Sequence, residues 1–100
     1  MTRQSNSKKD GSNFCEEIVL KVWHKGLPIL NNDANKLRRD KFGYIIQFSQ
    51  FGNRNNVHGW EIDHILPVAK GGSDSLDNLQ PLNWHNNFQK GDNVNWKPGS

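Results

Sequence analysis

Cysteine is almost absent from this chain of 100 residues, in which Cys15 is the only one. A single cysteine excludes an intramolecular disulfide, and it also excludes a zinc ribbon built on paired cysteines. We therefore expect no structural zinc. Cys15 lies among apolar residues, which predicts a buried small hydrophobe rather than a nucleophile, and a free thiol fits a reducing compartment.

Long apolar runs are lacking as well. No segment approaches the roughly 18 apolar residues of a membrane-spanning helix. Residues 1–12 also lack the apolar core of a signal peptide. These absences predict a cytoplasmic location and no contact with a membrane.

The length and the aromatic content predict one small domain. The hydrophobic fraction is 33%, but it includes four Trp and five Phe, whose side chains bury much area each. We assign the domain to residues 13–100 and expect the polar residues 1–12 to form a disordered tail. The net charge of +3 favours a polyanionic partner, although many domains with this charge bind no nucleic acid.

The first part of the domain is predicted to support the second. Spacing of apolar residues predicts a supporting helix over 14–25, capped by Asn13 and ended by Gly26. One or two helical turns are expected within 34–40. A strand is expected over 44–49, where aromatic and β-branched residues mix.

Residues 59–92 are predicted to form the core of the domain, in the order strand, turn, strand, loop, helix. Alternating apolar residues indicate a tight antiparallel pair around 60–69. A short helix follows, which Asn83 can cap and Gly91 can end. The fold class is therefore α+β, with a short strand pair, a helix and an N-terminal supporting helix.

The two faces of this last helix carry different side chains. Trp84 and Phe88 are i, i+4 neighbours and are predicted to face the core. Asn83, Asn87 and Lys90 share the other face, which should face the strand pair. This arrangement brings polar groups of the helix towards those of the strands.

These polar groups suit the chemistry of a divalent cation. Asp63 and Asn87 offer one carboxylate and one amide oxygen, a small set that fits Mg²⁺, which keeps waters and phosphate oxygens as its other ligands. A cation there would act as a Lewis acid on a phosphodiester. His64 is the candidate general base for an attacking water. Neighbouring strand residues point to opposite faces, so Asp63 and His64 can share one cleft only if the chain bends there.

Other polar residues are assigned to support this site. Asn78 could fix the loop that carries His64 through side chain-to-backbone hydrogen bonds. Lys90 could hold a phosphate or neutralise charge in the transition state. The candidates for contact with a nucleic-acid backbone are Arg38, Arg39, Lys41, Arg54, Lys70 and His85. The cluster around Arg38 could equally be an ordinary solvated turn.

The order and spacing of these residues resemble the HNH endonuclease family, in particular its members without a zinc ribbon and the HNH domain of CRISPR effector nucleases. The matching positions are Asp63-His64-Ile65 with Pro67, Gly71-Gly72, Asp77-Asn78, and Asn87 to Lys90. The resemblance implies a ββα-metal fold. It implies that Asp63 and Asn87 bind the metal, that His64 is the general base and that Asn78 orients its loop. It also implies hydrolysis of double-stranded DNA with Mg²⁺ or Mn²⁺, leaving 3′-hydroxyl and 5′-phosphate ends.

Two departures from the family pattern narrow this expectation. The chain lacks the paired cysteines of many members, and its last helix offers Asn87 where toxin members have a cluster of histidines. Weak binding of Mg²⁺ or Mn²⁺ is therefore favoured over tight binding of Zn²⁺. Zn²⁺ stays an alternative metal for the site.

Three functions fit these observations. The first is a DNA endonuclease with little sequence preference of its own, which a homodimer or a partner protein could make specific. The second is a DNA-binding or assembly module without turnover. The third is an RNA nuclease, because the chemistry addresses a phosphodiester and not a sugar.

Overall fold

The computed structural model describes residues 4–99. In chain order the helices and strands are α1 (Glu16–Trp23), β1 (Leu27–Pro28), β2 (Leu37–Arg39), β3 (Ile45–Gln47), β4 (Trp60–His64), β5 (Leu79–Asn83) and α2 (Trp84–Lys90). Short 3-10 turns lie at Phe48–Gln50, Val68–Lys70 and Leu76–Asn78. Within residues 4–99, no helix is both long and apolar enough to cross a lipid bilayer.

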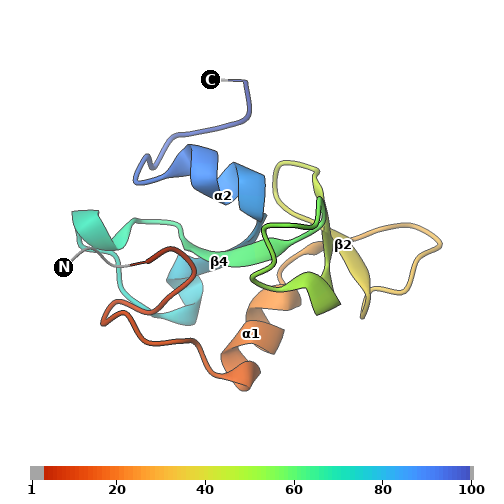
Figure 1. Ribbon diagram of the computed structural model, residues 1–100, viewed down its shortest axis with the longest axis horizontal. Helices are drawn as coiled ribbons and strands as arrows, with labels where there is room; N and C mark the ends of the chain where they lie inside the picture. The colour runs from red at the N-terminus through yellow and green to blue at the C-terminus, as the bar shows by residue number, and fades with distance from the viewer. Residues whose placement is uncertain (1–3, 100) are drawn as a thin grey trace.

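The strands form two antiparallel sheets. One has the order β1-β2-β3, and the other is the pair β4-β5, in which Trp60 faces Asn83 and His64 faces Leu79. Figure 1 shows β4 between the two helices, with α1 on one side and α2 on the other. β4, β5 and α2 form a ββα unit, which confirms the predicted α+β fold class.

Alternation along β4 explains why its two faces differ. Trp60 and Ile62 point to the side of α1 and are buried with Trp23, whose ring lies 5.3 Å from that of Trp60. Each large apolar side chain buried in this way contributes about 1.5–3 kcal/mol. The ring nitrogen of Trp60 donates to the backbone oxygen of Phe48 at 3.2 Å, so its polar atom is satisfied. Glu61 and Asp63 alternate with these residues and face α2.

A buried carboxylate joins the three-stranded sheet to α2. Asp40 is fully buried, and its Oδ1 accepts from the backbone nitrogens of Phe42 and Tyr44, each at 3.0 Å. Its Oδ2 accepts from the backbone nitrogen of Asn83 at 3.0 Å and from Nδ2 of Asn86 at 2.9 Å. These four bonds replace the water that the carboxylate loses on burial, and they fix the start of α2.

The first part of the domain differs from the prediction in several places. α1 begins at Glu16, with Cys15 at the N-cap and no side-chain cap, so the predicted cap at Asn13 is wrong. The prediction that Cys15 is buried is also wrong, because Cys15 is exposed. Residues 34–40 do not form a helix. Instead β2 pairs with both β1 and β3, and this tertiary pairing outweighs the local preference. The strand predicted over 44–49 is shorter and ends at Gln47.

The pairing partner of β4 also differs from the prediction. β4 pairs with β5, not with residues 65–69, which belong to the loop between the two strands. Pro81 lies within β5 opposite Ile62, where its missing N–H costs nothing because the pair exchanges no hydrogen bond. The N–H of Ile62 points outward and donates to Oδ1 of Asn6 at 2.7 Å.

The ends of α2 are as predicted, but one of its faces is not. Asn83 caps the helix by accepting from the backbone nitrogen of His85 at 3.0 Å, and the helix ends before Gly91. The prediction that Trp84 and Phe88 face the core is wrong, because Phe88 is 62% exposed. The face turned to the strands is the polar one, as expected for Asn87.

The polar segment that we expected to be disordered, residues 1–12, makes contacts in its described part. Asn6 covers the outer edge of β4, as described above, and the backbone nitrogen of Lys9 donates to both carboxylate oxygens of Asp74 at 2.9 and 3.1 Å. Residues 1–3 lie outside the described residues. The segment therefore borders the polar pocket at β4.

Candidate active site

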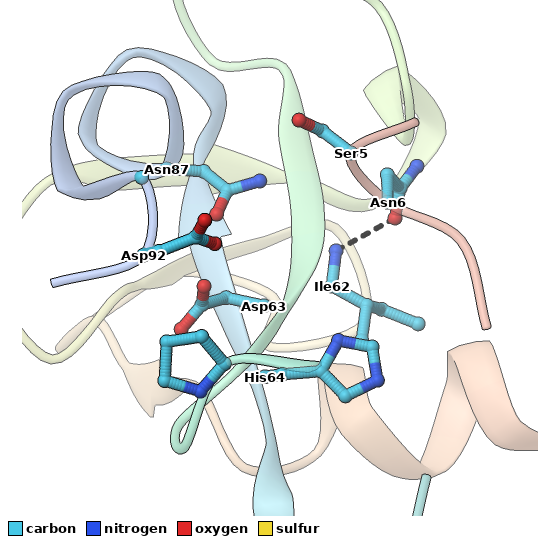
Figure 2. Close-up of a pocket in the computed structure, with 9 residues that line it drawn as sticks. Ser5, Asn6, Ile62, Asp63, His64, Asn87 and Asp92 are labelled. Carbon is cyan, nitrogen blue, oxygen red and sulfur yellow. Dashed lines mark hydrogen bonds between the residues drawn. The ribbon is translucent and has the colours of Figure 1, made fainter. Parts of the chain in front are cut away.

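A polar pocket lies between β4, the end of α2 and the N-terminal segment (Figure 2). It contains three residues that the sequence assigned to the site. Its lining residues are Ser5, Asn6, Ile62, Asp63, His64, Pro67, Asn87, Gly91 and Asp92.

Asp63 is a buried carboxylate with a donor on each oxygen. Its Oδ2 accepts from Nε2 of Gln80, its partner on β5, at 2.8 Å, and its Oδ1 accepts from Nζ of Lys90 at 3.1 Å. Burial raises the pKa of Asp63 above its ordinary value, and the bond from Gln80 and the charge of Lys90 oppose this rise. Each carboxylate oxygen can accept more than one bond, so both retain capacity for a cation.

Asn87 presents an amide oxygen to the same pocket. Its Nδ2 donates to Oε1 of Glu61 at 2.8 Å, so its oxygen is directed elsewhere. Figure 2 shows this oxygen and the carboxylates of Asp63 and Asp92 on one side of β4. Within the described part of the chain, the Asp92 side chain has no hydrogen bond or ion pair. The sequence analysis missed Asp92, although its place one residue after Gly91, beyond the end of α2, could have indicated it.

His64 lies at the pocket border but on the other side of β4. Figure 2 shows its ring pointing away from the carboxylate of Asp63. The bend that would turn both side chains into one cleft is therefore not found, since both residues belong to β4 with regular pairing. The ring is nearly buried and lies 6.0 Å from that of Phe14.

Asp74 holds the ring of His64. Its Oδ1 lies 2.8 Å from Nε2 of His64, and its carboxylate also accepts from the backbone nitrogen of Lys9. Burial would raise the pKa of Asp74, but the bonds from His64 and Lys9 outweigh it, and the pKa lies below its ordinary value. An ionised carboxylate only accepts, so Nε2 carries a proton and Nδ1 is left as the basic atom. The sequence analysis also missed Asp74, which only its place after Gly71-Gly72 could have indicated.

Asn78 fixes the loop between β4 and β5 through the kind of bonds that were expected. Its Oδ1 accepts from the backbone nitrogen of Leu66 at 2.8 Å, and its Nδ2 donates to the backbone oxygens of Leu66 at 3.1 Å and Ser73 at 2.8 Å. The loop turns at Gly71 with φ of +95°, and a Cβ on Gly72 would lie 1.7 Å from the oxygen of Leu66. Both glycines are therefore needed for the loop that carries Asp74.

The comparison with known families agrees with this geometry. The model of the family described as HNH endonuclease matches residues 44–93, which is half of the chain. The chain belongs to the HNH endonuclease family. The match spans β3, β4, β5 and α2, and therefore the pocket residues Asp63, His64 and Asn87. No curated protein and no solved structure matches the chain.

Membership of the HNH family indicates a nuclease that acts on nucleic acid with a divalent metal ion. The pocket residues fit such an ion. Asp63, Asn87 and Asp92 offer oxygen atoms, which Mg²⁺ and Mn²⁺ prefer. Among residues 4–99 there is no group of three His, Cys, Asp or Glu side chains that could hold a metal.

Lys90 has a different place from the one expected of a phosphate-binding residue. It is 5% exposed, and its Nζ donates to Oδ1 of Asp63 and to the backbone oxygen of His64, the latter at 3.3 Å. In this conformation Lys90 balances the charge of Asp63 and joins α2 to β4.

Of the basic residues proposed for nucleic-acid contact, two are held by contacts within the protein and four are exposed. Arg38 is 9% exposed and donates to the backbone oxygens of Ala34 at 2.9 Å and Gly26 at 3.0 Å, so it holds the fold together and is no longer a candidate for such contact. Arg54 is paired with Glu61. The remaining candidates are exposed; they are Arg39, Lys41, Lys70 and His85.

Proposed function

We propose that this protein is a metal-dependent DNA endonuclease that hydrolyses phosphodiester bonds with one divalent cation, Mg²⁺ or Mn²⁺. One observation carries the proposal: the oxygens of Asp63, Asn87 and Asp92 line one pocket, and His64, held by Asp74, borders it. A carboxylate–amide oxygen set with a positioned base suits hydrolysis of a phosphodiester by an activated water.

The proposed roles follow from the contacts. Asp63 and Asn87, with Asp92, would hold the cation, which supplies Lewis acidity to the phosphate and stabilises the leaving oxygen. His64 takes the proton of the attacking water on Nδ1, while Asp74 accepts from the proton on Nε2. Water must therefore reach the ring at the end of β4, where His64 borders the pocket.

Two further groups support the reaction without touching the reacting atoms. Asn78 fixes the loop that carries Asp74, and Lys90 places a positive charge beside the buried carboxylate of Asp63, which favours its ionised form. The exposed basic residues are proposed to contact the DNA backbone in a salt-sensitive manner. A homodimer or a partner protein would supply sequence specificity.

Cleavage of matched substrates tests the proposal. Supercoiled plasmid, a DNA duplex and an RNA of the same sequence are incubated with Mg²⁺, Mn²⁺, Zn²⁺ or EDTA. We expect cleavage of DNA with Mg²⁺ or Mn²⁺ and none with EDTA. Asn87→Ala should abolish it, whereas the matched control Asn35→Ala, at an exposed position, should not.

Two results would replace the proposal. Cleavage of RNA but not of DNA would identify an RNA nuclease, because the same site reads a phosphodiester. Binding of DNA by a folded protein that cuts nothing in any metal would identify a binding or assembly module.

A further inference from the structure

The side-chain amide of Asn87 is held from behind by a residue that the proposed reaction does not use. Glu61 precedes Asp63 by two residues on β4, so both side chains face α2. Glu61 is 4% exposed and Asn87 is 9% exposed, and Nδ2 of Asn87 donates to Oε1 of Glu61 at 2.8 Å. The amide therefore has a buried anionic partner on the side away from the pocket.

Arg54 fixes the carboxylate of Glu61 in turn. Its Nε donates to Oε2 and its Nη2 to Oε1, each at 2.8 Å, so both oxygens act as acceptors. The guanidinium carbon lies 5.9 Å from the ring centre of Trp84 and 5.7 Å from that of Phe88. These contacts explain the exposure of Phe88, because its ring covers Arg54 rather than the core.

This arrangement decides which end of the amide faces the pocket. A carboxylate accepts hydrogen bonds and cannot donate them, so only the NH₂ group of Asn87 can face Glu61. A reversed amide would place two acceptors against each other and would turn Nδ2, which binds no cation, into the pocket. Glu61 itself is not among the residues that line this pocket, and its carboxylate is paired with Arg54.

We propose that Glu61 is a positioning residue which, held by Arg54, orients the Asn87 amide with its oxygen towards the cation. The inference rests on the proposed function, because that function assigns Asn87 to the cation. Residues that orient a metal ligand from behind typically affect metal affinity by about 10- to 100-fold.

Glu61→Gln tests the orientation. Its new NH₂ group can donate to Oδ1 of Asn87 and so permits the reversed amide. We expect Mn²⁺ affinity to fall about tenfold or more, measured without DNA as paramagnetic broadening of the Gly91 backbone signal during a Mn²⁺ titration. The Asn87 side-chain amide signals should shift as the bond to a carboxylate is lost. The matched control, Glu16→Gln at an exposed position of α1, should change neither readout.

A second substitution separates orientation from a general structural role. In an Asn87→Asp background the side chain offers an oxygen whichever way it is turned, and the glutamine introduced at position 61 can donate to it. Glu61→Gln should therefore weaken Mn²⁺ binding when residue 87 is Asn and should not weaken it when residue 87 is Asp. A loss of the same size in both backgrounds would overturn the inference, because it would show damage to the fold rather than to the amide orientation.

The inference and the proposed function fail in different ways. If Glu61→Gln leaves both Mn²⁺ affinity and the Asn87 amide signals unchanged while the unaltered protein cuts DNA, the inference is overturned and the function stands. If the unaltered protein shows no Mn²⁺ broadening and cuts no DNA, both are overturned.

Discussion

The Nε2 atom of His64 lies 2.8 Å from Oδ1 of Asp74, an acid ten residues further along the chain. The ring of His64 points away from the Asp63 carboxylate, although both residues border one pocket (Figure 2). The proposed base and the proposed cation site therefore lie on the two faces of β4, and both border the same pocket.

The first prediction concerns the pair itself. Asp74→Ala removes the acceptor that fixes the proton on Nε2 and the ring orientation of His64. We expect the cleavage rate constant to fall by about tenfold or more, with little change in Mn²⁺ affinity, since Asp74 does not line the proposed cation pocket. Single-turnover cleavage and a Mn²⁺ titration measure the two effects. An unchanged rate with an intact fold would contradict the role given to Asp74.

Asp74 also predicts a pH dependence of stability. Its pKa in the folded protein lies below the ordinary value of 3.8, so the ionised form stabilises the fold above that pH. This contribution is lost as the pH falls through the lower, folded-state pKa. The difference in thermal stability between the unaltered protein and Asp74→Asn should therefore be fully present above about pH 5 and should disappear in stronger acid. A difference that stays constant with pH would show that the charge of Asp74 plays no part.

The buried pair of Lys90 and Asp63 predicts a link between metal and stability. Lys90→Met leaves the carboxylate of Asp63 buried without a positive charge, which should lower the free energy of unfolding by about 3–5 kcal/mol in EDTA. Mn²⁺ should then raise the melting temperature of this variant more than that of the unaltered protein, because the cation replaces the missing charge.

The matched control is Lys21→Met, which removes an exposed ion pair with Glu17. Such pairs contribute about 0–1 kcal/mol, so this variant should lose little stability and respond to Mn²⁺ as the unaltered protein does. Equal Mn²⁺ effects in Lys90→Met and the unaltered protein would place the cation away from Asp63.

Much of the ββα unit could be predicted from local patterns. Alternation of apolar and polar residues identifies β4, and Asn83 with Gly91 marks the ends of α2. Asn87 and Lys90 follow at helical spacing, so their common face towards β4 could be predicted as well.

The strand partner could not be predicted in the same way. Pro81 argues against a strand when the sequence is considered alone. It is tolerated because its position opposite Ile62 requires no N–H, and this depends on the register of the pair.

The contacts that complete the site depend on residues distant in the sequence. Phe88 has the spacing of a core residue, yet its ring covers Arg54. Arg54 lies there because it forms an ion pair with Glu61. Asp74 reaches His64 only because the loop after Gly71 folds back. Sequence spacing carries no record of such contacts, whereas the oxygen ligands Asp63 and Asn87 lie on regular elements.

Plasmid nicking by the unaltered protein, His64→Ala and His24→Ala tests the central claim most directly. His24 is an exposed histidine at the end of α1 and serves as the matched control. The account predicts nicking with Mg²⁺ or Mn²⁺ that His24→Ala retains and His64→Ala loses, while DNA binding and folding stay intact in both. Undiminished nicking by His64→Ala would contradict it, because the proton of the attacking water would then have another acceptor.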